Sequence, residues 1–184
     1  TETYKKHIII NIMKRILLCL MVALFATGCL FAKNNDEKMN VMSYNIRYDN
    51  SGDKDNQWKF RRDFAADLVK FHEADVFGAQ EVLNNQLNDL LNRLPEYAYV
   101  GVGREDGKTK GEYAPIFYRK DRFSVEKSGN FWLAEDINAI GKKGWDAACE
   151  RVATWAIFIG AGASEEIIRE FAYNRDWRFQ CRAF

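Results

Sequence analysis

The sequence predicts an α/β fold, and three neighbouring segments carry that prediction. Residues 39–48 read Met-Asn-Val-Met-Ser-Tyr-Asn-Ile-Arg-Tyr, a β-favouring run expected to be mostly buried, which leads into the turn formers of residues 49–52. Residues 74–81 form a second strand candidate, and residues 58–72 between them have the period of a helix. A strand, a helix and a strand in this order make a right-handed crossover, which places the two strands parallel and close together.

Both predicted strands end in polar side chains. Asn45 lies near the end of the first strand, and Gln80 and Glu81 end the second. Because ligands usually bind at the carboxyl ends of parallel strands, we expect Asn45 and Glu81 to share one site. Glu81 suits a hard cation such as Mg²⁺, which takes oxygen ligands, and the Asn45 amide can orient a bound water or phosphate oxygen. The alternative role for Glu81 is a charge at the N-terminus of the next helix.

Two helices are expected beside these strands. The first, residues 58–72, would be capped by Asn56 and would bury one apolar face, made of Phe60, Phe64, Leu68 and Phe71. Arg61 and Arg62 lie near its start, where positive charge opposes the helix dipole, and they are assigned to a solvated face. The second helix ends before Pro95 and has a leucine stripe at Leu83, Leu87, Leu90, Leu91 and Leu94.

Strand patterns follow the second helix. Residues 97–103 alternate in polarity and lead into a charged, glycine-bearing loop at residues 104–111. Residues 113–118 and 122–127 flank the turn sequence Arg119-Lys120-Asp121, and this arrangement predicts a hairpin.

The remaining residues are harder to assign. Residues 130–134 are short and aromatic, and residues 151–158 alternate, so each segment is predicted to be a strand. Residues 159–184 form an atypical tail, in which residues 165–171 match a short helix and residues 174–184 have no clean period.

The N-terminal segment has the pattern of a secretory signal peptide. The basic start Met13-Lys14-Arg15 is followed by a short apolar run at residues 16–26. We therefore assign residues 1–12 to an upstream extension, 13–32 to the signal peptide and 33–38 to a polar linker. The alternative, a transmembrane anchor, is disfavoured because the apolar run is shorter than the roughly 20 residues that a membrane-spanning helix needs.

The end of the signal segment resembles a bacterial lipobox. It reads Ala26-Thr27-Gly28-Cys29, and cleavage before Cys29 would leave this cysteine lipidated and the protein attached to a membrane. Ala26 stands where the motif usually has Leu, so ordinary cleavage near Gly28 or Ala32 stays open. In either case we expect an exported protein, whether periplasmic, secreted or a membrane-anchored lipoprotein.

Charge and cysteine usage argue against nucleic-acid binding and against a zinc site. The 27 Lys and Arg residues against 26 Asp and Glu give a net charge of +1, without the basic excess typical of nucleic-acid binding. Of the 4 cysteines, Cys19 and Cys29 lie in the signal region. Cys149 and Cys181 could pair in an exported chain, but they have no zinc-ligand spacing, so no zinc site is predicted.

Five sequence blocks in this order resemble the endonuclease/exonuclease/phosphatase family. They are Ser43-Tyr-Asn-Ile-Arg47, Gln80-Glu81, Gly111-Glu-Tyr-Ala-Pro-Ile-Phe-Tyr118, Phe131-Trp-Leu133 and Gly144-Trp-Asp146. The family comprises metal-dependent phosphoesterases related to deoxyribonuclease I, exonuclease III and the sphingomyelinases. The resemblance covers residues 39–158 and implies part of a four-layer αββα sandwich with mixed sheets.

The resemblance also implies a reaction and its residues. It implies Mg²⁺ or Mn²⁺ as cofactor and a phosphoester substrate, which could be a sugar phosphate, a lipid or a nucleic acid. Glu81 would be the family's metal-binding glutamate, and Asn45 would belong to the same catalytic site. The family has an arginine at the position of Arg151 that can bind a phosphate oxygen, although a surface role is as consistent with the sequence. Glu112 is assigned with Arg151 to the substrate phosphate. Glu112 and Tyr113 would line a site-facing loop, or they would merely flank a hairpin.

Catalytic groups that the family draws from its second half have no counterpart after residue 158. The sequence has 2 histidines, His7 upstream of the predicted signal peptide and His72 at a helix end, where a cation suits the dipole. The family's Asn-Thr-His, Asp-x-Asn and terminal Asp-His motifs are absent. We therefore expect the N-terminal part of the domain, with the second half missing or replaced, and no appreciable activity. The alternative is a non-catalytic surface lipoprotein or a frame-shifted fragment with a binding role only. No protein partner is predicted.

Overall fold

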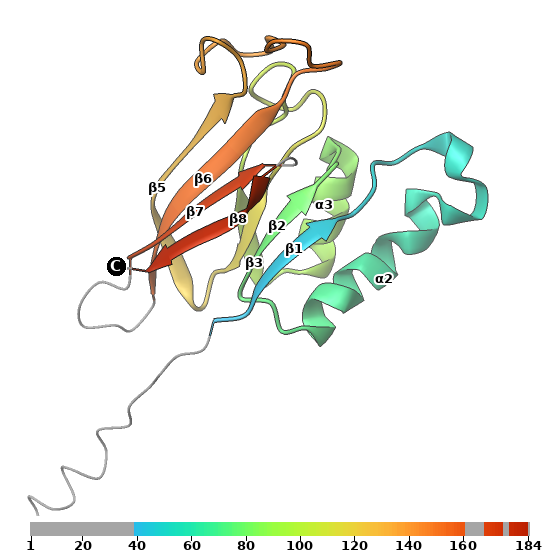
Figure 1. Cartoon of the computed structure of the whole chain (residues 1–184). Helices are drawn as coiled ribbons and strands as arrows, with labels where there is room; N and C mark the ends of the chain where they lie inside the picture. Colours follow the sequence, from blue (N-terminus) through green and yellow to red (C-terminus); the bar gives the residue numbers. More distant parts are fainter. Residues whose placement is uncertain (1–38, 161–167, 175–176, 184) are drawn as a thin grey trace, which may run out of the picture. The chain divides into compact units, whose positions relative to one another are not determined.

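A computed structural model describes residues 39–160, 168–174 and 177–183, the last two ranges as backbone only. The predicted signal peptide, Cys29 and the linker lie outside the described residues. Two four-stranded sheets and two α-helices make up the described part (Figure 1). Within it, no helix combines the length and apolar character that crossing a membrane requires.

The first sheet has the strand order β1-β2-β4-β3 and is mixed. Its strands are β1 (Val41–Asn45), β2 (Val76–Gln80), β3 (Tyr97–Val100) and β4 (Ile116–Arg119). β1 and β2 are parallel, as the sequence predicts, whereas β4 is antiparallel to both β2 and β3. β1 lies at the edge of this sheet and its residues are exposed or half-buried, so the expectation of a mostly buried strand is wrong.

Two helices cover one face of the first sheet. A 3-10 helix, η1 (Ser51–Asn56), leads into α2 (Trp58–Phe71), which makes the β1–β2 crossover, and α3 (Asn84–Arg93) joins β2 to β3 (Figure 1). The core under the helices includes Phe77 of β2 and Leu90 of α3, both fully buried. Because strand side chains alternate between faces, neighbouring Val76 points the other way, into the core shared with the second sheet.

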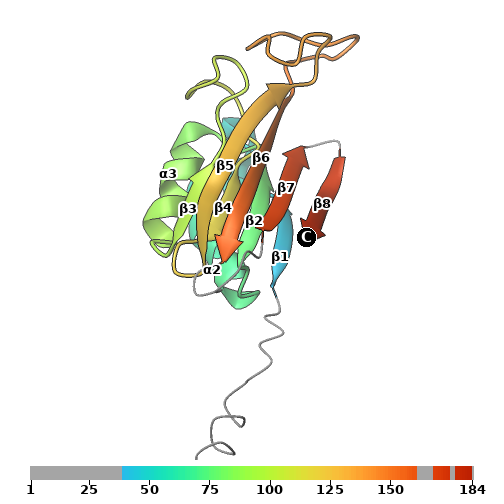
Figure 2. The ribbon, with the colours of Figure 1, turned by 90° about the vertical axis from the view of Figure 1, so that its left-hand side faces the viewer.

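The second sheet is an antiparallel meander with the order β5-β6-β7-β8. Its strands are β5 (Phe123–Trp132), β6 (Val152–Gly160), β7 (Ile168–Asn174) and β8 (Trp177–Ala183). Figure 2 views this sheet from the front, with the four strands in sequence order across the view. Phe158 of β6 packs between the sheets, with its ring centroid 4.9 Å from that of Tyr118 and 6.1 Å from that of Phe123. The layers helix, sheet, sheet are those expected of a partial αββα sandwich.

The hairpin predicted between residues 113–118 and 122–127 is wrong. Its two arms become β4 and β5, which belong to different sheets. The chain turns tightly between them, since the Arg122 N–H donates to the Arg119 carbonyl over 3.2 Å. Tyr118 and Phe123 on either side of this turn both pack on Phe158, so burial between the sheets decides the path of the chain.

Two further predictions of secondary structure also need correction. Residues 130–134 are not a separate strand, because residues up to Trp132 continue β5 past a bulge between Val125 and Lys127 that interrupts the expected alternation. Residues 168–171 of the predicted tail helix begin β7, and the segment without clean period contains β8. Pairing with β6 stabilises β7, and such tertiary pairing overrides local preference.

Helix α2 buries a different face from the one predicted. Phe60, Phe64 and Phe71 are 62%, 68% and 80% exposed, while the buried positions are Trp58, Ala65, Ala66 and Val69. Both sets have helical spacing, so periodicity alone cannot choose between them. The small alanines let the helix approach the sheet closely. The predicted cap is also wrong, because Asn56 ends η1 and the N-cap is Gln57, which makes no side-chain cap bond.

Helix α3 agrees with its prediction. Leu87 and Leu90 are buried on its inner face, Leu94 ends it as the C-cap, and Pro95 follows.

Candidate functional site

Asn45 and Glu81 meet at the carboxyl ends of β1 and β2. The parallel register pairs Asn45 with Gln80, which brings the next residue, Glu81, beside the Asn45 amide. Asn45 Nδ2 donates a hydrogen bond of 3.1 Å to Glu81 Oε1, and the Tyr48 N–H donates one of 3.3 Å to Glu81 Oε2. Glu81 is 9% exposed. The predicted proximity is therefore confirmed, whereas the roles of the two residues in catalysis stay predictions.

Both strands end in a backbone conformation that non-glycine residues rarely adopt. Arg47, two residues after β1, and Glu81, directly after β2, each have a φ of 60°. Such conformations persist only where the surrounding structure enforces them, and they are concentrated at functional sites. Here Val82 bridges to Tyr113 directly after Glu81, which fixes the path of the chain. The sharp turns keep Asn45 and Glu81 at the sheet edge.

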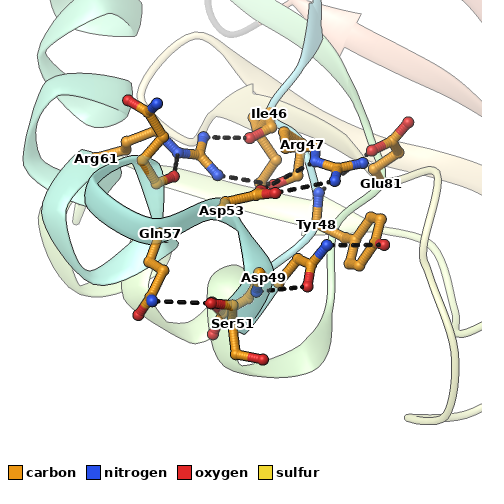
Figure 3. A network of polar contacts seen from close by, with 12 residues as sticks. Ile46, Arg47, Tyr48, Asp49, Ser51, Asp53, Gln57, Arg61 and Glu81 are labelled. Atoms are coloured by element: carbon orange, nitrogen blue, oxygen red, sulfur yellow. Dashed lines mark hydrogen bonds and ion pairs between the residues drawn. The ribbon is translucent and has the colours of Figure 1, made fainter.

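Arg61 of α2 clamps the loop that follows β1. Its guanidinium donates to the Ile46 carbonyl over 2.7 Å, to the Arg47 carbonyl over 3.3 Å and to the Asn56 carbonyl over 2.5 Å (Figure 3). Arg47 in turn pairs with Asp53 at 3.1 Å. This ion pair lowers the pKa of the Asp53 carboxyl. The assignment of Arg61 to a solvated face is therefore wrong, because its three carbonyl partners outweigh an unfavourable place in the helix dipole.

Gln86 of α3 supports the same loop from inside the protein. Its side chain is fully buried and accepts hydrogen bonds of 3.1 Å from the N–H groups of Asp49 and Leu83. Its amide also donates to the Arg47 carbonyl over 2.9 Å. The loop that begins at Asn45 is thus held by three different elements, β2, α2 and α3.

A cavity lies next to Glu81, between the ends of the two sheets. It is lined by Gln80, Glu81, Arg104, Glu112, Tyr113, Ala114, Glu150, Arg151 and Val152. The sequence-predicted residues Glu81, Glu112 and Arg151 therefore surround one cavity. Asn45 is not among its lining residues, and it lies beside the cavity through its contact with Glu81.

The cavity combines three carboxylates with two guanidiniums. Glu81, Glu112 and Glu150 carry the negative charges, and Arg104 and Arg151 the positive ones. Arg104 Nη1 pairs with Glu112 Oε2 at 2.9 Å. Mixed charges at one partly enclosed surface are suited to a cation together with the phosphate group that it would neutralise.

Comparison with solved structures decides the family. No family model matches the chain. The endonuclease/exonuclease/phosphatase from Bacteroides vulgatus is 51% identical, with a TM-score of 0.68, and the match covers 72% of this chain and 49% of that one. The chain belongs to the endonuclease/exonuclease/phosphatase family.

Two structures from Bacteroides thetaiotaomicron extend the likeness. A family protein is 40% identical, with a TM-score of 0.69, over 73% of this chain and 47% of the other. A mannosyl-6-phosphatase is 40% identical, with a TM-score of 0.68, over 74% of this chain and 50% of the other. The chain thus spans about half the length of these members of the endonuclease/exonuclease/phosphatase family.

A divalent cation is the cofactor that the family implies, and the residues at the strand ends fit one in part. Mg²⁺ usually takes one or two carboxylates and completes its shell with water and substrate phosphate. Glu81 offers one oriented carboxylate at the cavity wall. Among the described residues, no three Asp, Glu, His or Cys side chains converge as a metal cluster. The residues present therefore fit a largely hydrated cation at Glu81, with Asn45 orienting that carboxylate.

Sequence reasoning alone does not find Arg61, Gln86 or Arg104. Gln86 had a usable signal, since it stands three residues after the N-cap Leu83, where a glutamine side chain often bonds the backbone of the cap. Arg61 and Arg104 had none, because their partners are far away in the sequence or belong to loops.

Proposed function

We propose that this chain carries the cation-binding part of a metal-dependent phosphoester hydrolase site. The contact between Asn45 and Glu81 beside a cavity that also contains Arg151 is the observation that carries the proposal. A bound Mg²⁺ or Mn²⁺ would neutralise charge on the substrate phosphate. Asn45 fixes the Glu81 carboxylate, and the Tyr48 N–H holds its second oxygen, so that the carboxylate needs little reorganisation to bind a cation.

Arg151 is the proposed phosphate ligand of the chain. It precedes β6, and its carbonyl accepts a 2.9 Å hydrogen bond from the Leu133 N–H, which fixes its backbone at the cavity. A guanidinium can bind two phosphate oxygens at once through its forked donors. Glu112, in contrast, cannot bind a phosphate oxygen as a carboxylate, so its proposed role is to hold Arg104.

A sugar phosphate is the substrate class we propose. The mannosyl-6-phosphatase from Bacteroides thetaiotaomicron is 40% identical to this chain. The net charge of +1 gives no electrostatic preference for nucleic acid.

We also propose that the protein is exported through the signal peptide at residues 13–32. If the lipobox is used, Cys29 is lipidated. Mass spectrometry of the mature N-terminus from the native host would test this, and an intact cytosolic N-terminus would contradict it.

We further propose that this chain binds its ligands but has little turnover. General acid–base groups contribute roughly 10²–10⁴-fold each to catalysis. The sequence has 2 histidines, and neither lines the cavity in the described residues. This favours the alternative, a binding role for this chain.

Titration calorimetry with Mg²⁺ and with Mn²⁺ tests the cation site. We expect weak binding that Glu81→Gln abolishes and that Glu126→Gln, at an exposed position of β5, leaves unchanged. Equal binding by the Glu81→Gln variant would refute the cation site.

Hydrolysis of bis-p-nitrophenyl phosphate and of a sugar phosphate is expected to be negligible. Metal-dependent turnover that tracks the monomer and disappears in Glu81→Ala would show that the chain is catalytic as it stands.

A further inference from the structure

Arg104 lines the cavity from a loop that several contacts hold in place. Its N–H donates to the Glu112 carbonyl over 3.2 Å, and its own carbonyl accepts a 2.7 Å bond from the Trp132 indole. Gly103 and Gly141 are packed so closely that an added Cβ would lie 2.2 Å from the carbonyl oxygens of Lys110 and Glu105. The guanidinium therefore extends from a backbone that has little freedom to move.

The side chain of Arg104 is only partly satisfied by the protein. It is 16% exposed, and its Nη1 pairs with Glu112, which is 17% exposed. Its Nε is buried and has no hydrogen-bond partner among the described residues. A guanidinium carries five N–H donors, so one carboxylate oxygen leaves most of them available.

The contact of Arg104 with Glu112 uses one guanidinium donor, whereas the bidentate contact of Arg47 with Asp53 uses two. The donors that Glu112 does not use can therefore serve a ligand in the cavity that Arg104 lines. The cavity is lined by three carboxylates and two guanidiniums, which leaves one excess negative charge. Without Arg104 the excess would be two, and the repulsion toward an entering phosphate dianion would be larger.

We propose that Arg104 is a second phosphate-binding arginine, which acts together with Arg151 on the phosphate group of the substrate. The phosphate oxygens would accept from the Arg104 donors that Glu112 does not use, while Glu112 keeps hold of Nη1 and fixes the plane of the guanidinium. This role rests on the proposed function, because it assumes that a phosphate group enters the cavity. Two guanidiniums at one phosphate favour a dianionic monoester over a singly charged diester.

Calorimetry with inorganic phosphate, on the full chain and in saturating Mg²⁺, tests the proposal. We expect Arg104→Ala and Arg104→Lys each to weaken phosphate binding about tenfold or more, since loss of hydrogen bonds to a charged group has effects of this size. Arg119→Lys is the matched control, because Arg119 also pairs with a nearby carboxylate, Asp121, but lies away from the cavity. Phosphate affinity within twofold of the native chain in both Arg104 variants would overturn the proposal.

Two further measurements separate this inference from folding and from the proposed function. The double variant Arg104→Gln with Glu112→Gln keeps a neutral hydrogen-bonding pair in the loop. If it unfolds at the same temperature as the native chain but has lost phosphate binding, the proposal is supported. Mg²⁺ binding measured without phosphate should be unchanged in all Arg104 variants. Phosphate binding that needs Arg104 in a chain that binds no Mg²⁺ would support this inference while refuting the proposed function. If the native chain binds no phosphate at millimolar concentrations, the inference about Arg104 is overturned.

Discussion

The first and second sheets position their site residues in different ways. The first sheet places Glu81 and Arg47 at strand ends with left-handed backbone and surrounds them with hydrogen bonds from Asn45, Arg61 and Gln86. The second sheet places Arg151 directly before an ordinary antiparallel strand. Strained positions need many supporting contacts, whereas a residue on a regular strand needs few.

This difference indicates where the site is rigid. The proposed cation side depends on a polar network around the buried side chains of Glu81 and Gln86, which are costly to leave unpaired. The proposed phosphate side depends on apolar packing that keeps the second sheet against the first, and on the loop that carries Arg104. Changes to packing should therefore separate the sheets, and changes to polar groups should loosen the cation side alone.

The largest effect is expected from Phe158→Ala. The Phe158 ring is fully buried between the sheets, so its removal should lower the free energy of unfolding by about 3–5 kcal/mol. Urea unfolding followed by tryptophan fluorescence would measure the change. A loss below about 1 kcal/mol would mean that the sheets do not depend on this contact for their packing.

Gln86→Leu should have the next largest effect. It leaves the N–H groups of Asp49 and Leu83 without their partner, and the Arg47 carbonyl keeps only its bond from Arg61. An unpaired backbone group costs about 1–3 kcal/mol when it is buried. Mg²⁺ binding should weaken as well, because the loop beside Glu81 is loosened. Asn92→Leu at an exposed position of the same helix is the control. Equal stability of the two variants would show that the buried amide does not support the loop.

Arg61→Lys should cost about 1–2 kcal/mol, because a lysine can replace only part of the three carbonyl contacts. Hydrogen exchange should locate the change at residues 46–49, with α3 protected as before. Lys59→Ala, at an exposed position of the same helix, should change neither quantity. Uniformly faster exchange throughout the first sheet would contradict a local clamp.

Asp106 is expected to make the loop that carries Arg104 sensitive to acid. Backbone N–H groups of Lys110 and Lys108 lower the pKa of this carboxyl below its usual value of 3.8. A lowered folded-state pKa stabilises the protein above the unfolded pKa, and this contribution is lost as the pH falls through the folded pKa. Below about pH 4, Asp106→Asn should therefore lose less stability than the native chain does. NMR titration of Asp106 would check the direction, and a raised pKa would contradict it.

The smallest effect is expected from Phe64→Ser. The ring is 68% exposed, so the free energy of unfolding should change by no more than about 0.5 kcal/mol. A loss of 2 kcal/mol or more, measured by the same urea titration, would show that this face of α2 is covered in solution.

The parts of the fold that the sequence predicts are those fixed by local pattern. The β1–β2 crossover, the leucine face of α3 and the meeting of Asn45 with Glu81 follow from periodicity and from the geometry of parallel strands. The failures concern choices made by distant partners. Both faces of α2 have helical spacing, and only contact with the sheet selects the one with Ala65 and Ala66. In the same way, pairing with β6 determines that the tail contains β7.

At position 81 the requirements of stability and of the proposed function conflict. Its backbone, with a φ of 60°, is one that glycine adopts freely and glutamate does not, whereas the proposed cation site needs the carboxylate. Selection for heat-resistant variants would therefore favour substitutions at this position that relieve the backbone and remove the proposed ligand. Engineering of this scaffold should accordingly hold residue 81 fixed and look for stabilising changes elsewhere.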